Sequence, residues 1–291
     1  MQKQSLAPGL YVAATPLGHL TDITERVREG LAHCDLLFAE DTRRAQSLLS
    51  ALGIHRPKSS IRALHGHNEK DVIEDVLNAL RQQQSVLLIS DAGTPAISDP
   101  GSFLVDAAWQ AGIHVTPLPG PSAVITALSV SGFTRFPMSF WGFAPAKTGA
   151  RRQWLTSIHA THGIAVLFET PHRAQDCLAD CAQIFGPDTP MLFAREISKQ
   201  HETLIRGSIV EVQGRIEQLR QQDPGSAKGE MVWVFDLGDK PQVSMDAAQV
   251  DSWAALLIQE MSAASVARCL VKMAGISRDE AYQAVLKAQR A

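Results

Sequence analysis

Long apolar runs are missing from the 291-residue sequence. The longest, such as Ser85–Ile89 and Ile164–Phe168, are far shorter than the roughly 20 residues that span a bilayer. The first residues, Met1–Pro8, also lack the apolar core of a signal peptide. We therefore expect a soluble, cytoplasmic protein that has no membrane partner.

Cysteine is scarce, and its four positions, 34, 177, 181 and 269, are too scattered for a disulfide framework. Cys177 and Cys181 are four residues apart on an expected helix, so a metal or redox pair is one interpretation. The alternative is an apolar helix face shared by Leu178, Cys181 and Ile184, because a buried thiol behaves as a small hydrophobic group. We favour the apolar face and expect no metal site.

Positive charge is not in surplus either, because the formal net charge is -3 at pH 7. Binding to nucleic acid phosphates draws on lysine and arginine, so any RNA site must be a local basic patch. Two nucleotide-binding fingerprints, G-x-G-x-x-G and G-x-x-x-x-G-K-[ST], do not occur. The usual cradles for a dinucleotide or a nucleoside triphosphate are therefore unsupported.

Short β-rich runs recur through the first part of the chain, at a spacing that suits alternating strands and crossover helices. The runs are residues 10–14, 36–39, 61–64, 86–89 and 113–116. Between the first two, Ile23, Val27 and Leu31 form a stripe with helical periodicity. The pattern predicts an α/β domain over residues 1–119, built on an open parallel sheet.

The pattern changes after residue 120, where longer helical stretches separate the strand candidates. These candidates are residues 138–143, 164–169, 191–194, 203–206 and 230–236. We expect a second α/β domain with a mixed sheet over residues 120–240. Strand signals then vanish, and a capping box at Ser277–Glu280 indicates that residues 241–291 form a small helical C-terminal appendage.

The segments that follow the first five strand candidates are rich in glycine, proline and polar residues. They are residues 15–20, 40–44, 65–69, 90–101 and 117–123. Ligands of open α/β sheets bind outside the carboxyl ends of the strands. Such turns let the backbone approach a ligand closely and offer it amide and carbonyl groups. A sulfonium compound such as S-adenosylmethionine is compatible with this lining, because carbonyl oxygens favour its positive sulfur.

Several motifs together resemble the class III methyltransferases of the tetrapyrrole-methylase fold. The main ones are Tyr11-Val-Ala-Ala-Thr-Pro-Leu-Gly-His-Leu-Thr-Asp-Ile-Thr24, Ala39-Glu-Asp-Thr-Arg43, Ser90-Asp-Ala-Gly-Thr-Pro-Ala-Ile-Ser-Asp-Pro-Gly101 and Leu118-Pro-Gly-Pro-Ser-Ala123. Further matches are Phe140-Trp-Gly-Phe143, Phe168-Glu-Thr-Pro-His-Arg173, Ala194-Arg-Glu-Ile197 and Lys228-Gly-Glu-Met231. The resemblance is to the branch that methylates a cytidine 2′-hydroxyl in 16S ribosomal RNA, in the decoding region of the small subunit.

The resemblance implies two α/β domains with S-adenosylmethionine in the cleft between them, and a homodimer. It assigns cofactor contacts to Leu17, Asp91, Thr94, Ser122, Ala123, Phe168 and Ala194. Pro16, Gly93 and Ile97 lie in the same loops and complete the expected cofactor site.

A base that accepts the proton of a ribose hydroxyl would speed its methylation. The candidates at the strand ends are Glu40, Asp41, His65 and Glu69, and Arg43 lies in the same polar group. For residues 40–43 the alternative is a helix N-cap, in which carboxylates lie near the positive end of the helix dipole. For Asp91 the alternative is an Asx turn. For His65 and His67 the alternative is a metal pair, and we favour hydrogen bonding in the loop over it.

A group of basic side chains outside the first domain is the candidate RNA surface. It comprises Lys147, Arg151, Arg152, His172, Arg173, Arg195 and Lys199, and we expect it to act with Arg43. The expected partner is 16S ribosomal RNA or the assembled small ribosomal subunit, and the alternative is an ordinary solvated face. Two other functions stay open: methylation of a ring carbon in a tetrapyrrole precursor, and RNA binding or assembly without catalysis.

Overall fold

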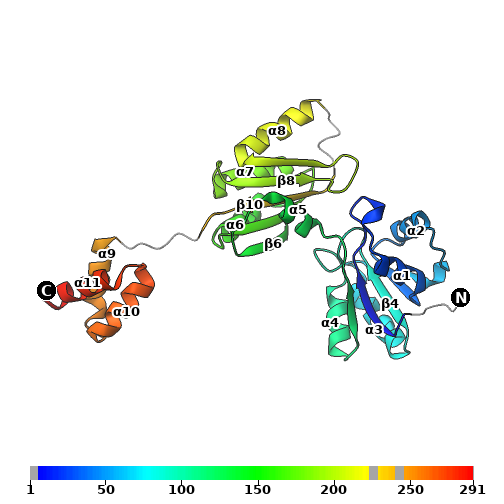
Figure 1. The fold of residues 1–291 in the computed structure, drawn as a ribbon, viewed down its shortest axis with the longest axis horizontal. Coiled ribbons are helices and arrows are strands. Elements are labelled where there is room, and N and C mark those ends of the chain that lie inside the picture. The colour runs from blue at the N-terminus through cyan, green and yellow to red at the C-terminus, as the bar shows by residue number, and fades with distance from the viewer. Residues whose placement is uncertain (1–5, 223–228, 240–245, 291) are drawn as a thin grey trace. The chain divides into compact units, whose positions relative to one another are not determined.

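The structure is a computed structural model that describes residues 6–222, 229–239 and 246–290. The chain separates into two compact units, Met1–Gly238 and Asp239–Ala291 (Figure 1). Lys228 of the last sequence motif lies outside the described residues. No helix in the described ranges is both long and apolar enough to cross a membrane.

The first unit contains two five-stranded sheets. The first sheet consists of β1 (Gly9–Ala13), β2 (Leu36–Ala39), β3 (Ile61–Ala63), β4 (Ser85–Ile89) and β5 (Val115–Leu118). Its strands are all parallel, in the order β3-β2-β4-β1-β5. β5 begins two residues later than the sequence predicts, because the Ile113 N–H still bonds to the Ala108 carbonyl at the end of the preceding helix.

Both faces of this parallel sheet are covered by helices (Figure 1). The helices are α1 (Glu25–His33) and α2 (Thr42–Ala51) on one face, and α3 (Glu69–Arg81) and α4 (Ser102–Gln110) on the other. Alternate strand residues point to opposite faces, so Tyr11 packs with the first pair and Leu10 with the second. Since the strands are parallel, the loops after their carboxyl ends gather at one edge.

The second sheet is mixed, as the sequence predicts. It consists of β6 (Met138–Phe143), β7 (Ile164–Glu169), β8 (Pro190–Arg195), β9 (Thr203–Ser208) and β10 (Met231–Asp236). The order is β6-β7-β10-β8-β9, in which only β6 and β7 pair in parallel. Helix α5 (Ala123–Ser131) packs on one face, against Val232 and Val234.

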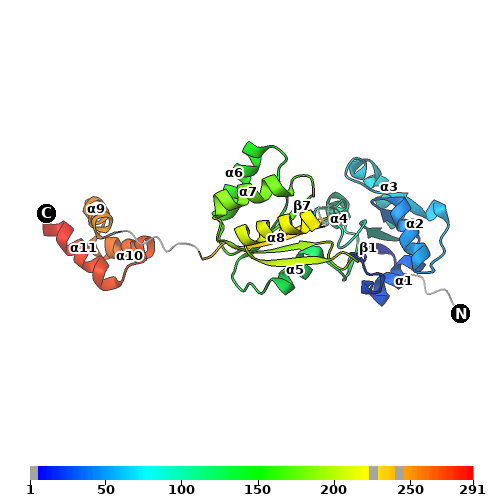
Figure 2. The ribbon, with the colours of Figure 1, turned by 90° about the horizontal axis from the view of Figure 1, so that it is seen from above.

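The opposite face of the second sheet carries α6 (Thr148–His159), α7 (Ala174–Phe185) and α8 (Ile209–Gln222) (Figure 2). Both Cys177 and Cys181 are fully buried in the core beneath these helices. A hydrogen bond with Cys181, together with burial, raises the pKa of Cys177. The apolar interpretation of this cysteine pair is therefore correct. In the part of the chain that the structure describes, no group of three or more His, Cys, Asp or Glu side chains could hold a metal ion.

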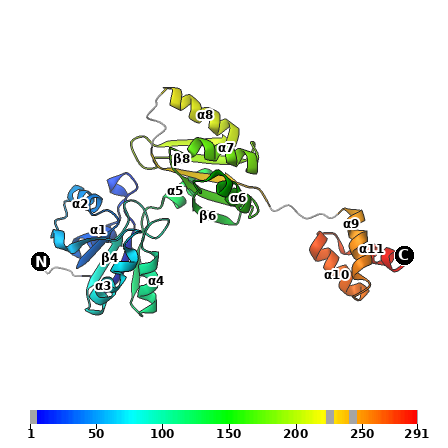
Figure 3. The same cartoon turned by 180° about the vertical axis from the view of Figure 1, so that it is seen from behind.

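The second unit is helical and comprises α9 (Ala247–Leu257), α10 (Ala263–Ala274) and α11 (Arg278–Arg290), packed together as Figure 3 shows. Its core includes Val250, Leu270 and Val285. The predicted capping box is present: the Ser277 N–H donates to Glu280 Oε2 at 2.8 Å, and the Glu280 N–H donates to Ser277 Oγ at 3.2 Å.

Candidate functional site

A cleft of about 820 Å³ opens at the carboxyl ends of the first sheet. Its lining comes from the loops after β1, β2, β4 and β5, from the ends of β6 and β7, and from the segments after β8 and before β10. The part of the first unit that contains the first sheet and the part that contains the second sheet therefore both line the cleft. Ligand sites of proteins typically have volumes of roughly 300 to 1,000 Å³, so the cleft is large enough for a cofactor.

The structure brings together nearly all of the residues of the expected cofactor site. Those that line the cleft are Pro16, Leu17, Asp91, Gly93, Thr94, Ile97, Ser122, Ala123 and Phe168. Ala194, which the resemblance also assigns to the cofactor, is not among the lining residues. The Ala194 side chain is fully buried in the core between β8 and α5, next to Val124.

Three loops of the first sheet are joined into one backbone frame. The Thr15 N–H donates to the Gly93 carbonyl at 2.8 Å, and the Gly93 N–H donates to the Thr15 carbonyl at 3.0 Å. Thr94 Oγ1 donates to the Pro121 carbonyl at 3.0 Å and so ties the loop after β4 to the loop after β5. Gly93 has φ +80°, and a Cβ there would lie 3.1 Å from a methyl group of Leu17, so the position favours glycine.

The loop after β1 also contacts the segment after β8 in the second half. The His19 N–H donates to Ser198 Oγ at 3.2 Å, and Ser198 Oγ donates to Asp22. A Cβ on Gly18 would lie 2.6 Å from the Ser198 carbonyl oxygen, closer than real side chains come. The glycine of the first motif therefore permits the close approach that forms one end of the cleft.

Backbone strain is concentrated around the cleft. Six described residues other than glycine have a positive φ, and four of them lie in the loop after β4 or the segment after β8. These four are Ala96 at +67°, Ser98 at +65°, Glu196 at +51° and Ser198 at +65°. Such conformations cost energy in residues that carry a Cβ and tend to cluster at functional sites.

The cleft lining is acidic. Its carboxylates are Glu40, Asp91, Asp99, Glu169, Glu196 and Glu230, and its basic side chains are Arg44 and Lys199. Four of these carboxylates are in ion pairs: Asp91 with Arg44 at 3.3 Å, Glu169 with Arg173 at 3.0 Å, and both Glu196 and Glu230 with Lys199, at 3.0 and 3.5 Å. Glu40 and Asp99 have no ion-pair partner among the described residues, so they leave the cleft with negative charge.

Burial, followed by the charge of the nearby Glu40 carboxylate, raises the pKa of Asp99 to about 6. Burial also raises the pKa of Glu40, followed by the charge of Asp91. Carboxyl groups with perturbed pKa values in a cleft are candidates for function. The sequence did not identify Asp99, although it lies in the quoted motif, because nothing in the motif indicates which of its carboxylates is buried.

Of the predicted base candidates, only Glu40 lines the cleft. Asp41 lies beside it and caps helix α2, where Asp41 Oδ1 accepts a hydrogen bond from the Arg43 N–H at 2.8 Å. The Arg43 guanidinium pairs with the same carboxylate at 2.7 Å and holds the pKa of Asp41 well below its usual range. The helix-cap alternative is therefore correct for Asp41. His65 does not line the cleft, and its backbone N–H donates to Asn68 Oδ1 at 2.8 Å.

Glu69 is not placed to act as a base, which corrects a further expectation. Its side chain is buried, and Oε1 accepts hydrogen bonds from the N–H groups of Gly101, Phe103 and Leu104 at 3.0, 2.9 and 3.2 Å. These groups form the start of helix α4, whose first N–H groups have no partner within the helix. Glu69 therefore fixes α4 and the end of the β4 loop.

We expect the Glu69→Ala variant to lose about 2–3 kcal/mol of unfolding free energy, because buried N–H groups then lack an acceptor. Glu69→Gln keeps an acceptor oxygen, so it should stay folded and retain methyl transfer. Urea unfolding and an activity assay on both variants test this. A folded Glu69→Gln protein without activity would return Glu69 to the list of bases.

The structure also removes three basic residues from the predicted RNA surface. Arg151 is 4% exposed, and its guanidinium binds Asp180 at 2.6 and 2.7 Å. Arg195 is 6% exposed and donates to the His201 carbonyl and to Thr203 Oγ1, both at 3.0 Å. Arg173 is half-buried and donates to the Ala144 carbonyl at 3.0 Å, in addition to its pairing with Glu169. These guanidinium groups hold the protein together and have little surface to offer a phosphate.

Of the other predicted RNA contacts, Arg43, Lys147, Arg152 and His172 are exposed, and Lys199 is half-buried. Lys147 and His172 follow β6 and β7, whose last residues line the cleft, and Arg43 follows β2. Arg152 is half-exposed and pairs with Asp180 at 2.7 Å. Lys199 lines the cleft itself. The exposed side chains of Arg43, Lys147 and His172 therefore follow strands whose carboxyl ends border the cleft.

Comparison with known proteins agrees with this geometry. Residues 9–213 match the family of tetrapyrrole (corrin/porphyrin) methylases. The chain is 39% identical to ribosomal RNA small subunit methyltransferase I of Xylella fastidiosa (strain Temecula1) over 94% of this chain and 98% of the relative. It is also 39% identical to the protein of the same name from Escherichia coli O157:H7, over 96% of this chain and 95% of the relative.

Solved structures share the fold at low sequence identity. A crystal structure of diphthine synthase covers 78% of this chain and 88% of its own, with a TM-score of 0.58 and 17% identity. Uroporphyrin-III-C-methyltransferase from Thermus thermophilus covers 79% and 95%, with a TM-score of 0.54 and 14% identity. These likenesses bear on the fold alone. With the family match over most of the first unit and near full-length relatives, the chain belongs to the tetrapyrrole methylase family and groups with its ribosomal RNA small subunit methyltransferase I members.

Proposed function

We propose that this enzyme transfers the methyl group of S-adenosylmethionine to the 2′-hydroxyl of a cytidine in the decoding region of 16S ribosomal RNA. The observation that carries the proposal is the similarity to relatives named for ribosomal RNA methylation over 94–96% of the chain. A homodimer in the cytoplasm belongs to the same proposal, on the strength of the family resemblance and the composition.

The cleft suits a cationic methyl donor. When bound, S-adenosylmethionine supplies a methyl group on a positively charged sulfur. The unpaired carboxylates of Glu40 and Asp99 favour a positive charge in the cleft, and partial burial strengthens that attraction. Leu17, Ile97 and Phe168 offer apolar surface for the uncharged parts of such a ligand.

Asp99 lines the cleft and has a pKa that suits a base for a hydroxyl proton. A base is most effective when its pKa lies near the working pH, and a value of about 6 leaves Asp99 mostly ionised at neutral pH. Glu40 contributes by keeping that pKa high. We therefore propose that Asp99 accepts the proton and that the charge of Glu40 raises the pKa of Asp99.

The negative charge of the cleft repels the RNA backbone, so phosphate contacts belong at the rim. We propose that Arg43, Lys147 and His172 make these contacts, together with Arg152. The acidic lining also fits the alternative of a tetrapyrrole acceptor, because both reactions use the same donor. The charge of the cleft therefore does not separate the two acceptors.

We expect the double variant Arg43→Ala/Lys147→Ala to bind ribosomal RNA more weakly and to lower the slope of log affinity against log salt by about 2, one for each phosphate contact. Binding titrations at several salt concentrations measure this slope. Arg81→Ala is a matched control, because Arg81 is exposed and pairs with Glu74 near the end of α3, before β4 begins. An unchanged slope in the double variant would remove these two residues from the RNA surface.

The proposed reaction is tested with small ribosomal subunits from a strain that lacks this gene. Incubation with labelled donor should place one new 2′-O-methylcytidine in 16S ribosomal RNA, located by mass spectrometry of nuclease fragments. Label that enters a tetrapyrrole precursor but no ribosomal RNA would favour the alternative acceptor.

A further inference from the structure

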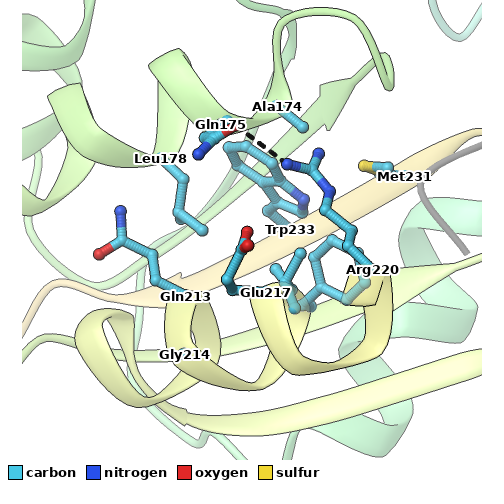
Figure 4. A pocket seen from close by; sticks show the side chains of 11 residues that line it. Ala174, Gln175, Leu178, Gln213, Gly214, Glu217, Arg220, Met231 and Trp233 are labelled. Carbon is cyan, nitrogen blue, oxygen red and sulfur yellow. Dashed lines mark hydrogen bonds between the residues drawn. The ribbon is translucent and has the colours of Figure 1, made fainter. Parts of the chain in front are cut away.

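A second cavity, of about 310 Å³, lies between α7, α8 and the face of the second sheet (Figure 4). Its apolar wall includes Leu178 from α7, Phe193 from β8, Ile216 from α8 and Trp233 from β10. Nothing in the proposed methyl transfer uses this cavity. Its volume falls at the lower end of the range for small-molecule sites, which is roughly 300 to 1,000 Å³.

Two of the residues that line this cavity carry a buried hydrogen-bond donor without an acceptor among the described residues. Trp233 is fully buried, and no described residue accepts a hydrogen bond from its indole Nε1. The buried Nε of Arg220 likewise has no acceptor among the described residues. Figure 4 shows both side chains within the space between α7, α8 and β10. Buried polar groups are nearly always paired in native proteins, so two unpaired donors in one cavity indicate a missing acceptor.

The surroundings of Arg220 leave its positive charge available. Arg220 Nη1 donates to the neutral side chain of Gln175 at 3.0 Å, the dashed contact in Figure 4. Glu217 also lines the cavity, but its exposed carboxylate accepts a hydrogen bond from Gln221 at 3.3 Å and makes no ion pair with Arg220. An anionic acceptor would therefore gain a charge-assisted hydrogen bond there.

Gly214 occupies an unusual position in helix α8. Glycine destabilises a helix interior relative to alanine, so its presence there is expected to have a reason. Gly214 lines the cavity, and a Cβ built on it meets nothing within 4 Å. Packing therefore does not require glycine at this position, and because Gly214 is one of the lining residues we expect a large side chain there to fill part of the cavity.

We propose that this cavity binds a small amphipathic carboxylate. The carboxylate oxygens would accept hydrogen bonds from Trp233 Nε1 and Arg220 Nε, and the apolar body would pack against Leu178, Phe193 and Ile216. A flexible alkyl acid and a compact aromatic acid share this chemistry.

The test uses the full chain labelled with ¹⁵N-tryptophan, which has five indole N–H resonances at most. The Trp233 resonance is identified by its loss in Trp233→Phe. Octanoate and 3-phenylpropanoate are titrated separately, and octan-1-ol and 3-phenylpropan-1-ol serve as uncharged counterparts. We expect a saturable shift of the Trp233 resonance with at least one acid, at an affinity at least tenfold above that of its alcohol.

Three variants of helix α8 keep the proposal testable if Trp233→Phe does not fold. Gly214→Leu should block the cavity and abolish acid binding in calorimetry, whereas Gly214→Ala should retain binding. Arg220→Gln should reduce the affinity for the acid to that for the alcohol. The proposal is overturned if neither acid binds up to its solubility limit, if acid and alcohol bind equally, or if Gly214→Leu binds as the wild type does.

Discussion

Replacing Asp99 with asparagine should slow methyl transfer by about 10²- to 10⁴-fold, the usual contribution of a general base. Asparagine has nearly the same shape but cannot accept a proton, so the cleft should keep its form. Single-turnover rates with saturating donor and subunits measure the effect directly. The expected loss is in kcat, with little change in the affinity for the RNA.

A purely electrostatic role of Asp99 would give a different result. If its charge only attracted the sulfonium, Asp99→Asn would weaken binding of S-adenosylmethionine but not of S-adenosylhomocysteine, whose sulfur is uncharged. The rate at saturating donor would then be close to that of the wild type. Calorimetry with both compounds distinguishes the two roles.

The pH dependence follows from the same carboxylate. Activity should rise with pH as Asp99 loses its proton, with a midpoint at about 6. Because the charge of Glu40 helps to raise the pKa of Asp99, Glu40→Gln should move that midpoint to lower pH. A rate that stays constant between pH 5 and pH 8 would contradict a base with this pKa.

At neutral pH the ionised carboxylate of Asp99 should also lower the free energy of unfolding. Its native pKa of about 6 lies above the ordinary value of 3.8, so the native state binds more protons than the unfolded state between these values. Stability therefore falls as pH rises through this window and stays lower at pH 7. After allowance for partial exposure, Asp99→Asn should be more stable at pH 7 by up to about 1 kcal/mol.

Replacing Arg151 with methionine should destabilise the protein by about 3–5 kcal/mol, because it removes a partner from a buried ion pair. Asp180 would stay buried with only the half-exposed Arg152 as counter-ion. Burial opposes the ionised form of Asp180, but hydrogen bonds from Arg152 and Arg151 outweigh it and lower the pKa of Asp180. Chemical denaturation at pH 7 measures the loss.

Arg152→Ala is the matched control on the same helix. Arg152 contacts the same carboxylate, but its side chain is 50% exposed, so its removal should cost no more than about 1 kcal/mol. If Arg151→Met instead kept wild-type stability and bound RNA more weakly, Arg151 would be an RNA contact after all.

The sheets were predictable from sequence because their signals are local. Runs such as 86–89 and 164–169 are apolar and rich in β-branched or aliphatic residues, and both became buried strands. The position of the cofactor loops followed from topology, since parallel strands bring their carboxyl ends together. For that reason the loops that contain Leu17, Asp91 and Ser122 meet in one cleft.

The roles of charged side chains were not predictable, because they depend on partners far away in the sequence. Glu69 accepts from residues more than 30 positions later, and Arg151 pairs with Asp180, 29 positions away. Both looked functional when only their neighbours in sequence were considered. Asp99 is the opposite case, because its neighbours in sequence gave no sign of a function. Its raised pKa depends on burial and on the carboxylates of Glu40 and Glu230.

We expect the acidic cleft of the first unit to bind the methyl donor. Isothermal titration calorimetry of the purified chain with S-adenosylmethionine tests it most directly. We predict one site per chain, weakened in Phe168→Ala, which removes apolar surface from the cleft, and unchanged in Arg81→Ala. Folded protein that takes up neither the donor nor S-adenosylhomocysteine, even with small ribosomal subunits present, would contradict the claim.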